Sequence, residues 1–294
     1  MTDSSRATVD VLRLAAFPDP VAVSGGSVGG NPAGVVLDAT GLDDAERQRI
    51  AAEVGYSETA FLERMGPARY RVRYFTPTTE VAFCGHATVA AGVALAERGH
   101  GPDLLLETLA GEVPVTTAPA GPDDPGPTAT LTSVPTRTRP AEPAQVAATL
   151  AAIGWSAADL DPRLPPHVAF AGNDHLVLAA ATRERLATLE QDEAALATVM
   201  RAGGWTTVHL VHARDATTFD ARDPAPAAGI SEDPATGSAA AAFGGYLRDL
   251  GLVPAPSRVI VLQGHDMGAP SRLVVDVLAD DRRVRVTGSA VPIG

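Results

Sequence analysis

The sequence contains one glycine-bounded, alanine-rich stretch twice, and this repeat constrains the fold more than any other feature. Residues 85–99 (GHATVAAGVALAERG) align with residues 237–251 (GSAAAAFGGYLRDLG), and six of the fifteen positions are identical. Upstream of each copy an arginine and a proline recur at the same spacing, as Arg73 and Pro77 and as Arg222 and Pro226. The first copy is apolar on all sides until its last turn, which is typical of a helix buried in a core. The repeat predicts two similar strand-rich lobes, each wrapped around one buried helix, with a cleft between them.

The rest of the chain reads mostly as strands, and therefore predicts an α+β fold. In the first half, apolar patterns predict strands over 9–17, 34–37, 70–75, 104–108 and 113–117 and a helix over 45–54. In the second half, they predict strands over 128–133, 167–170, 175–180, 207–213, 218–221, 258–263, 271–279 and 282–289, with helices over 143–153 and 183–200. Residues 118–127, rich in Pro, Gly and Asp, are typical of a linker. We expect a first lobe over 1–122, completed by the C-terminal strand 282–294, and a second lobe over 123–281.

Charge excludes several classes of protein. The formal net charge is −12, and all 23 basic residues are arginine, since the chain of 294 residues has no lysine. Without lysine the chain can form neither the Schiff base of a pyridoxal phosphate enzyme nor the phosphate loop of a P-loop NTPase. The basic run at 282–285 lies in an alternating strand, so we expect no nucleic-acid partner.

The sequence also predicts where the protein resides and how little it relies on cysteine. No run of about 18 apolar residues is present, so we expect no membrane-spanning helix. The N-terminal MTDSSRATVDVLRL lacks the basic region and apolar core of a secretory signal, which predicts a cytoplasmic protein. The single cysteine, Cys84, excludes an internal disulfide and a cysteine-rich zinc site, and we expect no metal site.

The two repeated helices can present their N-termini to one cleft. Free backbone N–H groups and the helix dipoles would favour a small carboxylate there. The donors would be the backbone groups of Gly85, His86, Gly237 and Ser238. The stretch 231–247 opens with Glu232 and Asp233, which also fit the acidic first turn of an ordinary capped helix. A cleft of this kind suits moving a proton on or off a carbon beside the carboxylate.

Two further residues admit both a structural and a functional interpretation. Glu58 lies at a helix-to-strand junction between apolar neighbours. It is either a solvated turn residue or, in a closed pocket, a carboxylate whose pKa desolvation raises toward that of a general base. Asn31 ends the glycine-rich loop 24–32, where Pro32 forces an extended backbone. Asn31 is therefore either a turn residue or an amide held at a pocket rim.

Five segments together resemble the phenazine-biosynthesis, PhzF-like isomerase family. They are GNPAGVVL (30–37), SETAF (57–61), FTPTTEVAFCGHAT (75–88), GISEDPATGSAAA (229–241) and QGHDMGAPSRL (263–273). The resemblance covers nearly the whole chain, and SETAF together with EDPATGSA is specific. It implies the diaminopimelate epimerase-like fold, in which two pseudo-symmetric lobes each wrap a sheet or barrel around a central helix. It also implies a cofactor-independent and usually homodimeric enzyme that isomerises small unsaturated amino acids by a proton shift.

The resemblance implies a role for each matching residue. Glu58 would be the acid/base that removes a proton from one carbon and returns it at another. His86, Asp233 and Ser238 would line the site and hydrogen-bond the amino and carboxylate groups of the substrate. Further substrate-binding residues would be Asn31, Cys84, Gly85, Thr236 and Gly237. Apart from the resemblance, His86 fits equally well as a core histidine, and Asp233 and Ser238 as helix caps.

A departure from related enzymes keeps alternatives open. Epimerases and proline racemases of this fold use one cysteine beside each central helix, whereas this chain has Cys84 in the first place and Thr236 in the second. A threonine hydroxyl is far too weak an acid–base group to replace a thiolate, which disfavours a two-thiol racemase. A Cys/Thr pair resembles that of hydroxyproline dehydratases, so a Cys84-dependent dehydratase or epimerase of a proline-like amino acid is one alternative. Cys84 also fits as a small apolar filler.

The leading hypothesis is thus an isomerase acting on a small cyclic or unsaturated amino acid in secondary metabolism. The third possibility is a non-enzymatic protein that binds small carboxylates. The segment 222–224 is more polar than in the family, and Ala269 stands where an arginine is frequent. Both departures bear on the choice of substrate.

Overall fold

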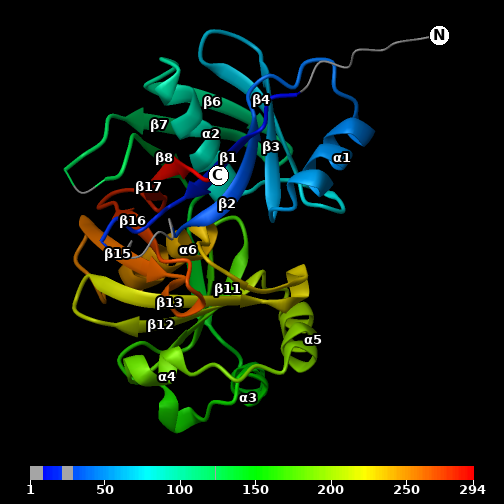
Figure 1. Ribbon diagram of the computed structural model, residues 1–294. Helices are drawn as coiled ribbons and strands as arrows, with labels where there is room; N and C mark the ends of the chain where they lie inside the picture. Colours follow the sequence, from blue (N-terminus) through cyan, green and yellow to red (C-terminus); the bar gives the residue numbers. More distant parts are fainter. Residues whose placement is uncertain (1–8, 22–28, 123) are drawn as a thin grey trace.

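A computed structural model describes residues 9–21, 29–122 and 124–294. The chain folds into two lobes that stack on one another (Figure 1), with the blue-to-cyan first half in one lobe and the yellow-to-orange segments in the other. The red C-terminal strand returns to lie beside the blue N-terminal one. The N-terminal stretch before residue 9, on which the cytoplasmic prediction rests, lies outside the described residues. So does most of the glycine-rich loop 24–32.

Eight strands of the first lobe close into a barrel. In order around it they are β1 (Leu12–Ala16), β2 (Asn31–Val36), β3 (Glu58–Arg64), β4 (Arg69–Phe75), β6 (Asp103–Thr108), β7 (Gly111–Ala118), β8 (Thr128–Thr132) and β17 (Val284–Pro292). Strand β17 closes the ring because it pairs with β8 along one edge and with β1 along the other. The C-terminal strand therefore completes the first lobe.

The second lobe repeats this order of strands. It runs from β9 (Arg137–Pro140) through β10 (His167–Phe170), β11 (Asp174–Ala179), β12 (Thr207–Ala213), β13 (Thr218–Ala225), β15 (Ser257–Gln263) and β16 (Ser271–Val277) to the first half of β17. From β1 to β8 and from β10 to β17, the pairings follow the same series of antiparallel, parallel, antiparallel, parallel, antiparallel and antiparallel. The duplication predicted from the sequence is therefore present in the topology.

The arginines that recur upstream of the repeat make the same contact in both lobes. Arg73 of β4 forms a salt bridge with Glu80 of the short strand β5 (Glu80–Val81). Arg222 of β13 forms one with Glu232 of β14 (Ile230–Asp233). Because β5 and β14 lead directly into the two repeated helices, each ion pair fixes the entry to one central helix.

The two central helices are buried because their sequences leave no polar face for solvent. Helix α2 (Gly85–Glu97) fills the first barrel and α6 (Gly237–Asp249) fills the second lobe, with residues 86–95 and 239–247 buried. Glycines allow close packing: a Cβ on Gly92 would lie 3.0 Å from Ala129 Cβ, and one on Gly244 would lie 2.8 Å from Val275 Cγ1. The predicted fold class, two pseudo-symmetric α+β lobes around central helices, is confirmed.

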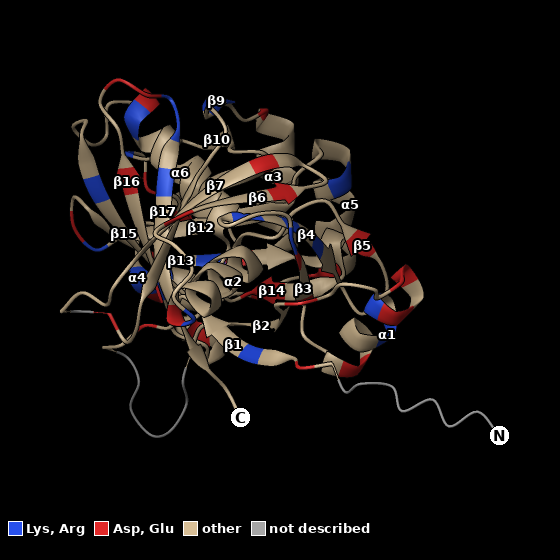
Figure 2. Ribbon diagram, turned by 90° about the horizontal axis from the view of Figure 1, so that it is seen from above, with Lys and Arg blue, Asp and Glu red and all other residues tan. Residues whose placement is uncertain are grey.

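The remaining helices lie on the outside. They are α1 (Asp44–Val54), α3 (Pro143–Ala152), α4 (Arg183–Ala187), α5 (Glu193–Gly203) and the short 3₁₀ turns Ala157–Asp159, Pro226–Ala228 and His265–Met267. Basic and acidic residues are interspersed in the view of Figure 2 rather than gathered on one basic face. Within the described ranges, every helix is too short or too polar to cross a membrane.

The structure corrects three details of the sequence-based prediction. The helix expected over 183–200 is two helices, because Asp192 caps a new one by accepting from the backbone N–H of Ala195. Glu232 and Asp233 lie in strand β14 and not in a first helical turn, since α6 begins at Gly237. Strand β8, placed in the second lobe by the boundary at residue 122, pairs with β7 and β17 of the first barrel.

Candidate active site

The N-termini of the two central helices meet at one cavity between the lobes. Gly85 and Gly237 are neighbours there, since a Cβ on Gly85 would lie 3.8 Å from the Cα of Gly237. The cavity has a volume of about 140 Å³ and takes its lining from both lobes. Its lining includes the predicted site residues Glu58, Cys84, Gly85, His86, Asp233, Thr236, Gly237 and Ser238. A larger groove of about 1030 Å³ lies beside α1 and the far end of α2 and contains none of these residues.

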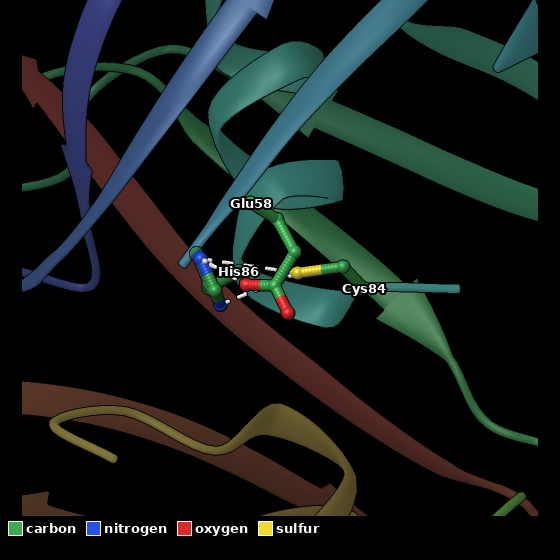
Figure 3. Close-up of side chains that lie close together, drawn as sticks. All are labelled: Glu58, Cys84 and His86. Atoms are coloured by element: carbon green, nitrogen blue, oxygen red, sulfur yellow. Dashed lines mark hydrogen bonds and ion pairs between the residues drawn. The ribbon is translucent and has the colours of Figure 1, made fainter. Parts of the chain in front are cut away.

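Three side chains of the first lobe converge on the cavity (Figure 3). Glu58 is the first residue of β3, Cys84 immediately precedes α2, and His86 lies in the first turn of that helix. His86 Nε2 lies 3.5 Å from Glu58 Oε2, and Cys84 Sγ lies 3.4 Å from His86 Nδ1. Glu58 is the most accessible of the three, with 21% of its side chain exposed against 6% for His86. The carboxylate can therefore reach a bound molecule.

Burial sets the charge of the two first-lobe neighbours of Glu58. It raises the pKa of the Cys84 thiol well above its usual range, and the nearby negative charge of Glu58 raises that pKa further. Burial lowers the pKa of His86, although the Glu58 carboxylate opposes that shift. At neutral pH the cavity thus contains a neutral thiol and a neutral imidazole beside Glu58.

The second lobe contributes Asp233, which is held by several hydrogen bonds. Thr236 Oγ1 donates to Asp233 Oδ2 at 2.6 Å, and Asn31 Nδ2 donates to Asp233 Oδ1 at 2.8 Å. Asn31 is only 2% exposed and also contacts His86 Nδ1 at 3.2 Å, so it links the two halves of the site. Asn31 is the first residue of β2 and not a turn residue, and its amide contacts two residues that line the cavity.

The protein environment shifts the pKa of the Asp233 carboxyl group strongly. Burial raises its pKa from 3.8 to about 7, and the hydrogen bonds from Thr236 and Asn31 oppose part of that rise. Asp233 therefore exchanges its proton near neutral pH, the range in which general acid–base catalysis is most effective.

The sequence patterns indicate no role for Gln263, which lies beside the cavity, or for Asn173, which lines it. Gln263 clamps the start of α6, because its side-chain amide donates to Asp233 O and to Thr236 Oγ1 while its oxygen accepts from the Thr236 N–H. Asn173 lies on the cavity wall. The dipeptide Gly172-Asn173 repeats Gly30-Asn31, and both asparagines stand two residues before the first paired residue of a parallel strand. That second repeat could have identified Asn173 from the sequence.

A buried polar network lies behind the second-lobe wall. Thr207, which lines the cavity, donates to Asp223 Oδ1 at 2.7 Å and contacts His175 Nδ1 at 2.8 Å. The other oxygen of Asp223 lies 2.9 Å from His209 Nδ1. Because the Thr207 hydroxyl proton is directed at Asp223, His175 Nδ1 must donate to the hydroxyl oxygen. The polar 222–224 segment noted in the sequence thus supports the wall of the cavity.

Comparison with known proteins agrees with this geometry. The family model for phenazine biosynthesis-like proteins, PhzC-PhzF, matches residues 22–294. An uncharacterized isomerase of Deinococcus radiodurans is 38% identical, over 90% of this chain and 86% of its own. The trans-2,3-dihydro-3-hydroxyanthranilate isomerase of Pseudomonas fluorescens is 30% identical, over 90% of this chain and 92% of its own.

Solved structures show the same fold. The phenazine biosynthesis protein of the PhzF family from Bacillus anthracis has a TM-score of 0.84 at 28% identity and covers 98% of each chain. A probable proline racemase from Agrobacterium radiobacter, at 14% identity and a TM-score of 0.63, covers 97% of this chain and 91% of its own and shares the fold alone. The chain belongs to the phenazine biosynthesis-like (PhzC-PhzF) family and is an isomerase of that family.

Proposed function

We propose that this isomerase moves a proton, and with it a double bond, on a small cyclic or unsaturated amino-acid-like carboxylate, without a cofactor. The observation that carries the proposal is the position of Glu58, whose carboxylate borders the cavity 3.5 Å from His86 Nε2 at the meeting point of two helix N-termini. A base beside a cluster of backbone N–H groups is the arrangement that removal of a proton from carbon requires.

The substrate carboxylate lies at the N-termini of α2 and α6 in this proposal. The backbone N–H groups of Gly85 and Gly237 and the two helix dipoles stabilise its negative charge and the charge that spreads into it during reaction. Neutral His86 and the hydroxyl of Ser238 contribute hydrogen bonds to the polar groups of the substrate. The cavity of about 140 Å³ favours a small ligand.

Glu58 then removes a proton from one carbon, the double bond shifts, and the proton returns to another carbon of the same molecule. One C–H bond breaks and another forms, so the reaction needs no oxidant or reductant. Asp233, with its pKa of about 7, holds or releases a proton at the opposite wall and compensates the charge of the intermediate. The name of the Pseudomonas fluorescens relative supports a cyclic amino acid as the substrate class.

Solvent deuterium incorporation tests the role of Glu58. Purified protein is incubated in D₂O with trans-2,3-dihydro-3-hydroxyanthranilate and a panel of cyclic amino acids, and product mass is measured. Glu58→Gln keeps the size of the side chain but cannot accept a proton, so incorporation should fall by about 10²- to 10⁴-fold. Circular dichroism and ligand binding should be unchanged. Retained incorporation in this variant would exclude Glu58 as the base.

The Cys84-dependent alternative receives less support from the electrostatics of the site. A Cys84-dependent dehydratase or epimerase needs a thiolate, whereas burial and Glu58 both keep the Cys84 thiol protonated.

We further propose that the protein is a homodimer in the cytoplasm and acts in secondary metabolism, as the family resemblance implies. Light scattering of the purified chain measures the first of these directly.

A further inference from the structure

Glu58, Cys84 and His86 place three different metal-binding groups around one point. The carboxylate oxygen, the thiol sulfur and an imidazole nitrogen all lie within 4.8 Å of one another. Two of the three come from the start of α2 and the third from the start of β3, so rigid elements hold all of them. Figure 3 shows the three side chains directed toward one another.

Two of the three ligand–ligand distances are close to the edges of a tetrahedral metal site. Zinc bonds of about 2.0 Å to oxygen and nitrogen and about 2.3 Å to sulfur place neighbouring ligand atoms roughly 3.3–3.6 Å apart. His86 Nε2 lies 3.5 Å from Glu58 Oε2 and 3.8 Å from Cys84 Sγ. Because Cys84 Sγ lies at similar distances from both ring nitrogens, 3.4 Å from Nδ1 and 3.8 Å from Nε2, the imidazole must turn to direct Nε2 at a cation that it shares with the sulfur.

We propose that a thiophilic divalent cation, of the Zn²⁺ type, binds Glu58, Cys84 and His86 and blocks the site. Binding forms three metal–ligand bonds and releases the thiol proton of Cys84 to solvent. Two negative ligands, the carboxylate and the new thiolate, then balance the two positive charges of the cation. Blocking, unlike binding, rests on the proposed function, because the cation would occupy the carboxylate that accepts the substrate proton.

The donor set selects among metals. One thiolate and one imidazole favour Zn²⁺ and Co²⁺, whereas Mg²⁺ and Ca²⁺ prefer sets made only of oxygen ligands. The imidazole is also supported from behind, because the Pro32 carbonyl forms a hydrogen bond with His86 and the Asn31 amide lies 3.2 Å from its Nδ1. Backing of this kind orients metal-binding histidines in known sites.

An open coordination position on the cation would be reached from the cavity. All three ligand residues line it, together with the N-terminal residues of both helices. A water molecule or a substrate carboxylate could complete the coordination there. Three protein ligands with one open position is the arrangement of zinc sites that exchange their outer ligand.

Titration with Co²⁺ tests binding without any substrate. Because Cys84 is the only cysteine in the chain, a thiolate-to-cobalt charge-transfer band can arise from this site alone. We expect that band, with the intense visible bands of tetrahedral Co²⁺, to saturate at one ion per chain, and Zn²⁺ to abolish it. Cys84→Ser should abolish the charge-transfer band, and His86→Gln should weaken Co²⁺ binding at least tenfold.

His265→Asn is the matched control, because it removes a histidine that pairs with Asp19 outside the cluster. Its titration should be indistinguishable from that of the parent chain. Absence of the charge-transfer band, or a band that Mg²⁺ displaces as readily as Zn²⁺, would overturn the proposal.

Deuterium incorporation tests the blocking effect. One equivalent of Zn²⁺ should reduce incorporation at least tenfold, and a chelator should restore it. If Co²⁺ binds as described but Glu58→Gln retains activity, the proposed function fails and the metal site stands. If Zn²⁺ increases incorporation, the cation is no inhibitor, and both the blocking effect and the cofactor-free reaction are wrong.

Discussion

The N-termini of the two central helices occupy equivalent places in the duplicated fold but carry different chemistry. At the start of α2, His86 lies between two partners: its Nδ1 is 3.4 Å from Cys84 Sγ, and its Nε2 is 3.5 Å from Glu58 Oε2. At the start of α6, the Asp233–Thr236 and Gln263–Thr236 contacts are 2.6 and 3.0 Å long. Between nitrogen and oxygen atoms, a contact of 3.5 Å is weak, whereas one near 2.8 Å is a strong hydrogen bond. The Glu58 carboxylate is therefore held only weakly by His86, whereas Asp233 is held firmly by Thr236.

Strand register shows how the two halves diverged. In the first lobe Ala33 pairs with Glu58, and in the second His175 pairs with Thr207, so Glu58 and Thr207 are equivalent and both line the cavity. Through the aligned ion pairs, Asp233 is the equivalent of Val81. Each lobe thus supplies one carboxyl group, from a different position of the shared framework. An inherited two-fold scaffold can in this way hold an asymmetric substrate.

Asp233→Asn should have the largest effect, because it removes the carboxyl group that the second lobe supplies. The amide keeps the shape of the side chain but cannot exchange a proton, so deuterium incorporation should fall by about 10²- to 10⁴-fold. The free energy of unfolding should instead rise at alkaline pH. The pKa of Asp233 in the folded state, about 7, lies above its ordinary 3.8, so the folded protein binds this proton more tightly than the unfolded chain. Its contribution to stability is present at acidic pH and is lost as pH rises through about 7.

Urea unfolding at pH 5 and pH 8.5 measures this effect. The parent chain should lose stability between these values, by an amount on the order of 3 kcal/mol for this group alone, because the unfolded chain has already lost this proton at pH 5. Asp233→Asn should remove that loss and be more stable than the parent at pH 8.5 only. Equal stability of the two proteins at both pH values would show that Asp233 is not a buried charge.

Matched alanine substitutions at the helix glycines test whether the packing is as symmetric as the topology. In Gly92→Ala the new methyl group would lie 3.0 Å from Ala129 Cβ, and in Gly244→Ala 2.8 Å from Val275 Cγ1. Overpacking costs about 1–3 kcal/mol, partly offset by the better helix propensity of alanine. Both should destabilise in thermal unfolding, Gly244→Ala more. Gly66→Ala is the control, because its methyl group would meet its nearest neighbour at 3.8 Å.

Asn31 and Asn173 allow a smaller test of the same contrast. Asn31 is buried and bonded to Asp233, so Asn31→Ala should lower the free energy of unfolding by about 1–3 kcal/mol. Asn173 is exposed on the cavity wall, so Asn173→Ala should leave stability within about 0.5 kcal/mol. We expect it to raise KM about tenfold, as for the loss of one hydrogen bond to substrate. An unchanged KM would exclude Asn173 from substrate binding.

The sequence predicted the duplicated fold because both lobes retain the glycines and arginines that fix each central helix. It also named eight residues that line the cavity, since these belong to the segments around those helices. It did not show that Asp233 belongs to a strand and not to a helical turn, because that depends on where α6 begins, three residues further on than an acidic first turn requires. Gln263 was missed for a different reason: its partners lie 27 and 30 residues away, and a side-chain clamp of that length leaves no periodic signal.

The final contrast concerns Cys84 and its equivalent Thr236, and it separates proton shift from thiol chemistry. In the proposed reaction the Cys84 thiol stays neutral, so Cys84→Ser should lower kcat for deuterium incorporation by less than tenfold. A thiolate-dependent elimination or epimerisation would instead lose at least three orders of magnitude, as expected when a reacting group is removed. Thr236→Cys sharpens the test by installing the second thiol. Because burial and Glu58 keep Cys84 protonated, no thiolate would face the new cysteine. Chiral chromatography of proline-like amino acids should therefore show no epimerisation by Thr236→Cys, and a gain of that activity would mean that one residue separates the two chemistries.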